Sequence, residues 1–186
     1  MVRESPAGPE RWKDVLIFLD AESAQRGSAD GMVATIGVAN RGKTPVPVLN
    51  PFATVQFQLH DERGFPLGIP TKPSSLRSRE FDDWKLEPPF PIVRTLMNGA
   101  VVAPETLNER TLRLQPGDAW EVAFLIDRLQ PEAAVAGAAN GAVSEVPLPD
   151  GTYRLRVVTT LIRADEPQDS SILQSPLIEV DFVRRH

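Results

Sequence analysis

An imidazole stands next to two carboxylates at His60-Asp61-Glu62. Such a group of side chains could bind a transition metal or transfer protons. The chain has two histidines, and the other is the last residue, His186, so no second imidazole lies nearby in sequence. The alternation of polar and apolar residues that ends at His60, and the turn-forming residues 61–64 after it, favour the end of a strand followed by a turn.

Acidic residues surround two aromatic rings in a second stretch, which contains Glu80, Phe81, Asp82, Asp83, Trp84 and Glu87. Paired carboxylates could bind Ca²⁺ or hydrolyse a glycosidic bond. The calcium-loop pattern D-x-[DN]-x-[DN]-G is missing from the sequence. Solvated loop charge is therefore favoured over a metal or catalytic site.

Composition excludes several classes of function. The 186 residues include no cysteine, which rules out disulfides, cysteine-ligated zinc, iron–sulfur clusters and thiol catalysis. The motifs of P-loop NTPases, dinucleotide-binding enzymes, HExxH metalloproteases and GxSxG hydrolases do not occur. We therefore expect a protein that is not an enzyme and binds no cofactor or metal. The net charge of −5 argues against a nucleic-acid partner.

The N-terminal residues 1–11 lack the apolar segment of a signal peptide and are expected to be a short disordered lead-in. As written, the sequence predicts a cytoplasmic protein; it would be periplasmic or secreted if a signal peptide had been removed. No stretch approaches the roughly 18 apolar residues of a membrane-spanning helix, so membrane insertion is not expected.

Apolar and polar residues alternate with the period of a β-strand in four runs, residues 54–60, 120–126, 153–161 and 178–182. Two upstream runs, residues 15–19 and 32–38, are more continuously apolar, as expected of strands covered on both faces. Between the runs, Gly, Pro and Asp favour turns at 30–31, 41–43, 63–64, 116–118 and 150–151. This pattern predicts an all-β fold.

The dipeptide Asn98-Gly99 lies between the apolar runs 92–97 and 100–103. Both residues tolerate positive φ, so this is the preferred sequence of a type I′ hairpin turn. We expect a β-hairpin here, inside a long segment at residues 65–110. A second long segment covers residues 128–149 and contains either a short helix or a mobile Ala/Gly-rich loop at 131–139.

Three segments together resemble bacterial immunoglobulin-like modules. They are N-x-G-x-x-P-V at residues 40–46, L-x-P-G-D at 114–118 and G-x-Y-x-L at 151–155. The same combination occurs in BsuPI-type intracellular proteinase inhibitors and in CARDB-like adhesion modules, to which the chain is weakly similar. The resemblance covers residues 12–64 and 111–183. It implies an immunoglobulin-like β-sandwich of about seven to nine strands. We therefore expect residues 12–186 to form one domain that carries an inserted hairpin and a long Ala/Gly-rich loop.

Two features of the run at 153–161 have alternative interpretations. Tyr153 follows a turn, so its hydroxyl could return to the backbone as a tyrosine corner, or its ring could be an ordinary half-buried aromatic. Arg154 and Arg156 form a small basic stripe on the same strand. Because the net charge is −5, we expect acids on a neighbouring strand to pair with these arginines.

The apolar residues of the segment 65–110 exceed what the framework needs. They are expected either to cover a sheet edge or to contact another protein or a second copy of the chain. The candidate contact residues are Phe81, Trp84, Phe90, Ile92, Val93, Leu96, Met97, Val101 and Val102. The leading hypothesis is a non-catalytic interaction module, a structural or accessory subunit of a protein assembly that binds through the hairpin.

Two other functions remain open at this point. The resemblance to BsuPI-type domains implies a protease inhibitor that acts through loops at one end of the sandwich. The acidic and aromatic residues 80–87 allow a carbohydrate-binding module or an enzyme.

Overall fold

Strands account for most of the backbone that the computed structural model describes, which covers residues 3–6, 12, 14–26, 29–68, 90–129, 146–168, 170–175 and 177–182. Within these ranges, eight strands have five or more residues. All pairings between these described strands and the shorter ones are antiparallel. The expected all-β fold is confirmed, and a sandwich of about seven to nine strands is consistent with it. None of the described residues forms a helix long and apolar enough to cross a membrane.

The first sheet has six strands in the order β1-β2-β3-β10-β7-β8. Their bounds are β1 Arg3–Pro6, β2 Val15–Arg26, β3 Ala29–Asn40, β10 Ala119–Ile126, β7 Ile92–Met97 and β8 Ala100–Val101. The ring of Phe18 on β2 lies over Gly37 on β3, where an added Cβ atom would lie 1.7 Å from the Phe18 Cζ atom. This close approach explains a glycine in the middle of a long strand.

The second sheet has five strands: β14 Ser170–Gln174, β13 Gly151–Ile162, β5 Gln56–His60, β6 Pro66–Gly68 and β15 Ile178–Phe182. Strands β14 and β15 follow one another along one edge of β13, because β14 pairs with its second half and β15 with its first half. Strand β5 pairs with the opposite edge of β13, and β6 pairs with β5.

Two short ladders complete the described fold. Strand β4, Val46–Leu49, pairs with β9, Thr111–Leu114, and β11, Arg128–Leu129, pairs with β12, Val146–Pro147. Two 3₁₀ turns, η2 Pro51–Thr54 and η3 Pro104–Asn108, each begin with a proline. Asn50 caps η2, because its side chain accepts a hydrogen bond from the Phe52 amide. The strand predicted at 54–60 therefore starts only at Gln56.

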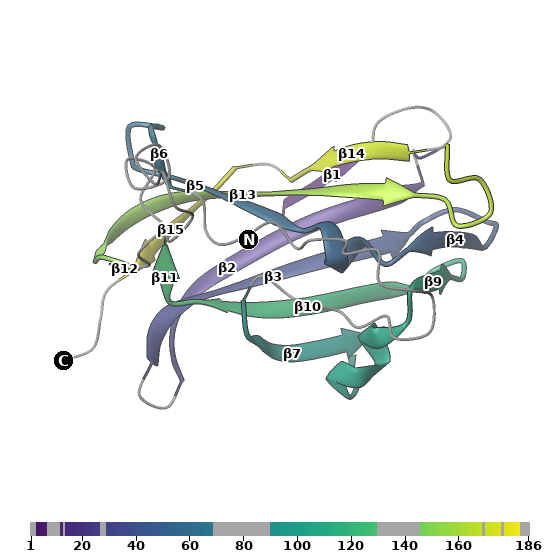
Figure 1. Cartoon of the computed structure of the whole chain (residues 1–186), viewed down its shortest axis with the longest axis horizontal. Helices are drawn as coiled ribbons and strands as arrows, with labels where there is room; N and C mark the ends of the chain where they lie inside the picture. Colours follow the sequence, from purple (N-terminus) through teal and green to yellow (C-terminus); the bar gives the residue numbers. More distant parts are fainter. Residues whose placement is uncertain are drawn as a thin grey trace, which may run out of the picture.

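The two larger sheets form two layers with the hydrophobic core between them (Figure 1). Phe57 from the second sheet packs edge-on against Phe124 from the first sheet, with ring centroids 5.7 Å apart. Phe57 makes a similar contact with Phe90, at 5.5 Å. The continuously apolar run at 32–38 is buried on both faces, as expected. Val33 belongs to a second, smaller cluster with Ala123 and Leu125 rather than to the main core.

The predicted hairpin is present, but its first strand is part of the first sheet. Strand β7 pairs with β10 along most of its length, so the hairpin extends the sheet instead of standing outside it. The hairpin was predicted to be an insertion because its pairing partner, β10, is distant in sequence, and a local pattern does not reveal a distant partner. The short helix or loop expected at 131–139 lies outside the described residues.

Tyr153 forms the tyrosine corner. Its ring is 4% exposed at the start of β13. Its hydroxyl donates a hydrogen bond to the carbonyl oxygen of Pro149, four residues upstream. This bond ties the turn before β13 to the strand itself, and it confirms the first of the two interpretations of this residue.

Replacing Tyr153 by phenylalanine should lower the free energy of unfolding by about 1–1.5 kcal/mol, because the ring stays and one hydrogen bond is lost. Denaturant titration of the purified protein measures this change. Thr152→Val is a matched control, because it removes a hydroxyl whose hydrogen bond, to the exposed Asp181 carboxylate, lies at the surface. A loss for Tyr153→Phe no larger than that of the control would contradict a stabilising corner.

Candidate functional site

The hairpin turn has the predicted geometry. Asn98 has φ 53° and Gly99 has φ 79°, so both central residues are left-handed. Leu96 lies opposite Val101 and Met97 lies opposite Ala100. The Val102 amide donates to the Thr95 carbonyl, which continues the ladder by one more bond of 3.0 Å.

The tip of the hairpin is fixed to the turn before β10. The Asn98 side chain accepts a bond from the Ala119 amide at 2.8 Å and donates to the Asp118 carboxylate at 3.0 Å. The backbone N–H of Asn98 also donates to the Ala119 carbonyl at 2.8 Å. Asp118 is itself held, because it accepts a bond from the Gln115 amide. The hairpin is therefore a docked edge of the first sheet and not a free arm.

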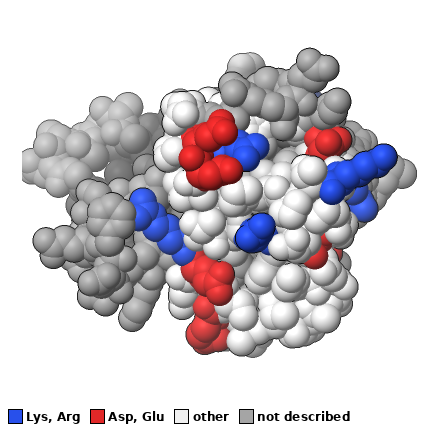
Figure 2. Space-filling view, turned by 90° about the vertical axis from the view of Figure 1, so that its right-hand side faces the viewer, with Lys and Arg blue, Asp and Glu red and all other residues white. Residues whose placement is uncertain are grey.

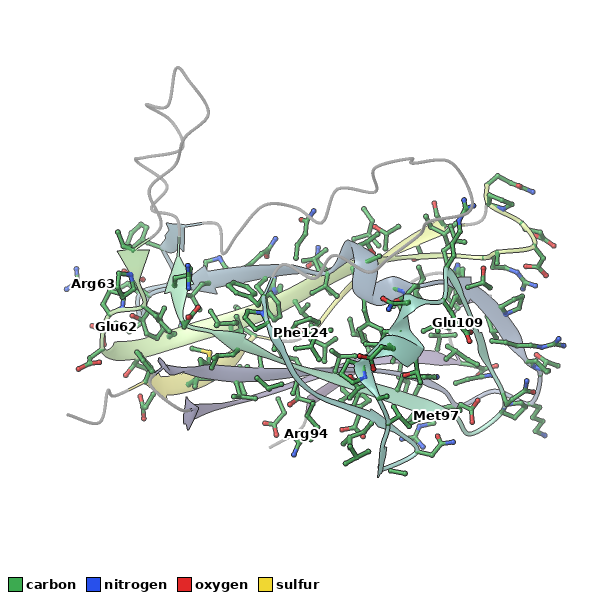
Figure 3. All side chains as sticks on the ribbon, turned by 60° about the horizontal axis from the view of Figure 1, so that its bottom comes forward. Glu62, Arg63, Arg94, Met97, Glu109 and Phe124 are labelled. Atoms are coloured by element: carbon green, nitrogen blue, oxygen red, sulfur yellow. The ribbon has the colours of Figure 1, made fainter. Side chains whose placement is uncertain are left out.

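The register with β10 decides which hairpin side chains face outward. Thr95 and Met97 lie opposite Val122 and Trp120, whose side chains enter the core. Arg94 and Leu96 alternate with them and therefore lie on the outer face of the sheet. Figure 3 shows Arg94 and Met97 on the hairpin side of the molecule and Phe124 in its interior.

The candidate contact residues of the sequence analysis fall into three groups. Phe81 and Trp84, with the acidic residues 80–87, lie outside the described residues. The residues that pack on the main core or belong to it are Phe90, Ile92, Met97 and Val102. The outer face has Val93, Leu96 and Val101. Phe90 is 3% exposed, and its contact with Phe57 makes its ring part of the core, so it cannot form part of a contact surface.

The outer face continues into apolar residues that are not among the predicted contact residues. Val93 packs against the small cluster of Val33, Ala123 and Leu125 on the side of the first sheet that faces away from the core. The signal for this cluster was present in the unbroken apolar runs of β3 and β10. The alternating pattern of β10 identifies the residues that face the core, and it says nothing about those between them. Ala123 and Leu125 were therefore not predicted to form an apolar row on the outer face.

Val101 is the most exposed of these side chains. It is 75% exposed, and the other large apolar side chains of the described residues with high exposure are Ile172 at 66% and Phe65 at 65%. Val101 and Leu96 are cross-strand partners, so their side chains lie side by side on the outer face. We call Val93, Leu96 and Val101 the hairpin surface.

His60 is the last residue of β5, and residues 61–64 form a turn after it, as expected. One Asp61 carboxylate oxygen accepts bonds from the Arg63 amide at 2.9 Å and the Phe65 amide at 2.8 Å. Gly64 takes the positive φ of 86° that this turn requires. Glu62 and Arg63 lie at the opposite end of the molecule from Met97 (Figure 3). In the described part of the chain, no three His, Asp or Glu residues gather as a metal site.

The basic stripe on β13 is paired only in part. Arg154 Nε lies 3.6 Å from Glu179 Oε2 on β15, as expected. Arg156 instead donates from Nη1 to the amide oxygen of Gln174 at 3.4 Å. In the loop after β13, two hydrogen bonds from the Arg163 guanidinium lower the pKa of Asp165. Figure 2 shows charged side chains of both signs scattered among uncharged surface on the face that it views.

Comparison with known proteins assigns no family to the chain. No family model matches it, and no curated protein matches it. Among solved structures, the crystal structure of the "Putative ApaA Protein from Bordetella pertussis" aligns with 92% of this chain and 96% of that chain, with a TM-score of 0.43 and 10% identity. A likeness of this extent assigns no function.

Proposed function

We propose that the chain is a non-catalytic protein-interaction module with an immunoglobulin-like fold, which serves as a structural or accessory subunit of a protein assembly. The order β2-β3-β10-β7 corresponds to the ABED sheet of a constant-type immunoglobulin domain. The pairing of β14 and β15 with β13, and of β13 with β5, corresponds to its GFC sheet. Tyr153 then occupies the strand F position where a tyrosine corner occurs.

The observation that carries the proposed binding role is the 75% exposure of Val101 on an edge strand, beside Leu96. Apolar side chains on the rim of a sheet are costly to leave in water and are favoured at contact surfaces. Val93 extends the same surface toward the apolar cluster on the outer face. The partner is another protein or a second copy of this chain.

The edge itself offers backbone groups to a partner. Strand β8 covers β7 only at Leu96 and Met97, so residues 92–94 have no described strand on the side away from β10. An extended segment of a partner could pair there and place its apolar side chains against the hairpin surface. Arg94, which is exposed on the same face, favours a partner segment that carries a carboxylate.

Replacing Val101 by lysine should abolish binding to the partner, because it puts a charge at the centre of an apolar contact. Wild type and variant serve as tagged baits in lysate of the source organism, and light scattering coupled to sizing reports self-association. Point substitution is preferred to deletion of residues 90–104, because deletion also removes β7 from the sheet and Phe90 from the core.

Ile172→Lys is the matched control. Ile172 is 66% exposed on β14, an edge of the other sheet, so the same charge is added at a comparable exposure. We expect the wild type and Ile172→Lys to retain one stoichiometric partner or a defined oligomer that Val101→Lys loses. Unfolding curves check that each variant is folded. Equal binding by a folded Val101→Lys variant would refute the proposed surface.

A further inference from the structure

The outer face of the second sheet carries a row of polar and basic side chains. On β5 and β13 the apolar partners Leu59 and Leu155 are buried in the core. The residues that alternate with them therefore point outward: His60 is the partner of Arg154, and Gln58 is the partner of Arg156. A histidine, a glutamine and two arginines thus meet on one face of two adjacent strands.

Arg156 lacks the carboxylate partner that three other arginines of the described residues have. Arg128, Arg154 and Arg163 each have a carboxylate oxygen within salt-bridge distance, at 3.2, 3.6 and 2.8 Å. In the described part of the chain, no carboxylate pairs with Arg156, and its guanidinium makes a weak 3.4 Å hydrogen bond to the neutral amide of Gln174. The positive charge of Arg156 is therefore left without a paired carboxylate among the described residues.

Two buried nitrogen atoms on this face also have no hydrogen-bond partner. They are Nε of Arg156 and Nδ1 of His60. A buried donor or acceptor without a hydrogen-bond partner costs about 1–3 kcal/mol, and more when the group is charged. Each such group in a folded protein calls for an explanation, and one explanation is a bound ion or ligand.

We propose that Arg156 and His60 bind an oxyanion, a carboxylate or a phosphate, on the outer face of the second sheet. The Nε and Nη2 atoms of a guanidinium form a fork that matches two oxygens of such a group. His60 lies diagonally across the strand pair from Arg156, at about 7–8 Å between backbones, which both side chains can span. Both residues are half-buried, so small rotations of the side chains bring the donors to an incoming anion. The site is independent of the hairpin surface.

The test is an NMR titration of the full chain at constant ionic strength. Inorganic phosphate is added in one arm and succinate in the other, and the Nε–Hε resonances of the arginines are followed. We expect the Arg156 resonance to shift and saturate, while that of Arg113, an exposed arginine on β9, shifts little. Saturation with phosphate alone or with succinate alone identifies the class of oxyanion, and saturation with both identifies a general oxyanion site.

Variants separate this site from unspecific attraction. Arg156→Lys keeps the charge but removes the fork, and we expect the affinity measured on the backbone amides of β5 and β13 to fall by about tenfold or more. His60→Ala should weaken binding in the same direction, and Arg113→Lys should leave it unchanged. No saturable shift at Arg156 with either anion, or equal shifts at all arginines, would overturn the proposal.

Discussion

Replacing Phe124 by alanine should lower the free energy of unfolding by about 3–5 kcal/mol. Phe124 is fully buried, and Figure 3 shows it in the interior of the molecule. Its ring meets that of Phe57 from the opposite sheet, so the truncation opens a cavity between the two layers. A domain of this kind has a total stability of about 5–15 kcal/mol, and a single substitution of this size therefore removes a large part of it.

Phe65→Ala is the matched control for this experiment. It makes the same chemical change at a ring that is 65% exposed in the turn between β5 and β6. We expect that control to change stability by no more than about 0.5 kcal/mol. Denaturant titrations of the three proteins give the comparison. A loss for Phe124→Ala no larger than that for Phe65→Ala would mean that the two sheets do not share one core.

Phe90 is a core residue that was predicted from the sequence to lie on a contact surface. Its ring contacts Phe57 as Phe124 does, so Phe90 contributes to the same aromatic cluster. The sequence around Phe90 is rich in proline and follows an acidic segment, which is typical of an exposed loop. Its burial depends on rings that lie far away along the chain, and a local pattern contains no information about them.

The parts of the fold that could be predicted are those that local patterns determine. Alternation identifies Phe57 and Leu59 as inward residues of β5, because a strand has a period of two. Asn98-Gly99 identifies the hairpin turn, because few residues tolerate two successive positive φ angles. The tyrosine corner at Tyr153 could also be predicted, because its hydrogen-bond partner, Pro149, is only four residues away in the sequence.

The candidate sites could be predicted only in outline, because each depends on register between distant strands. Leu96 faces outward and Met97 faces the core because Asn98 is bonded to Asp118 and Ala119. A shift of one residue would exchange the two faces. The sequence predicts that both arginines of β13 lie on one face. Only the register between β13 and β15 shows that Glu179 is the ion-pair partner of Arg154.

Replacing Asn40 by alanine should lower the free energy of unfolding by about 3–4 kcal/mol, because it removes three hydrogen bonds from a fully buried side chain. The Asn40 amide nitrogen donates to the carbonyl oxygens of Thr44 at 2.8 Å and Leu114 at 3.0 Å. Its side-chain oxygen accepts from the Gly42 amide at 2.9 Å. Strand β4 therefore starts from a loop that this one side chain holds against the end of β9.

Two comparisons test whether the hydrogen bonds are responsible for this loss. Gln56→Ala removes an exposed amide and should change stability by no more than about 0.5 kcal/mol. Asn40→Asp keeps the acceptor but points a carboxylate at two carbonyl oxygens, so the pKa of the new carboxyl group should rise in the folded state.

The pH dependence of Asn40→Asp then has a defined sign. Because the folded state holds this proton more tightly than the unfolded chain, whose pKa is about 3.9, the stability of the variant relative to wild type should be greatest at low pH and should fall as the pH rises. Denaturant titrations of both proteins across the acid range measure this difference. Two results together would contradict the role of Asn40 in fixing the loop between β3 and β4. The loss of stability in Asn40→Asp would be constant with pH, and the loss in Asn40→Ala would be no larger than that in Gln56→Ala.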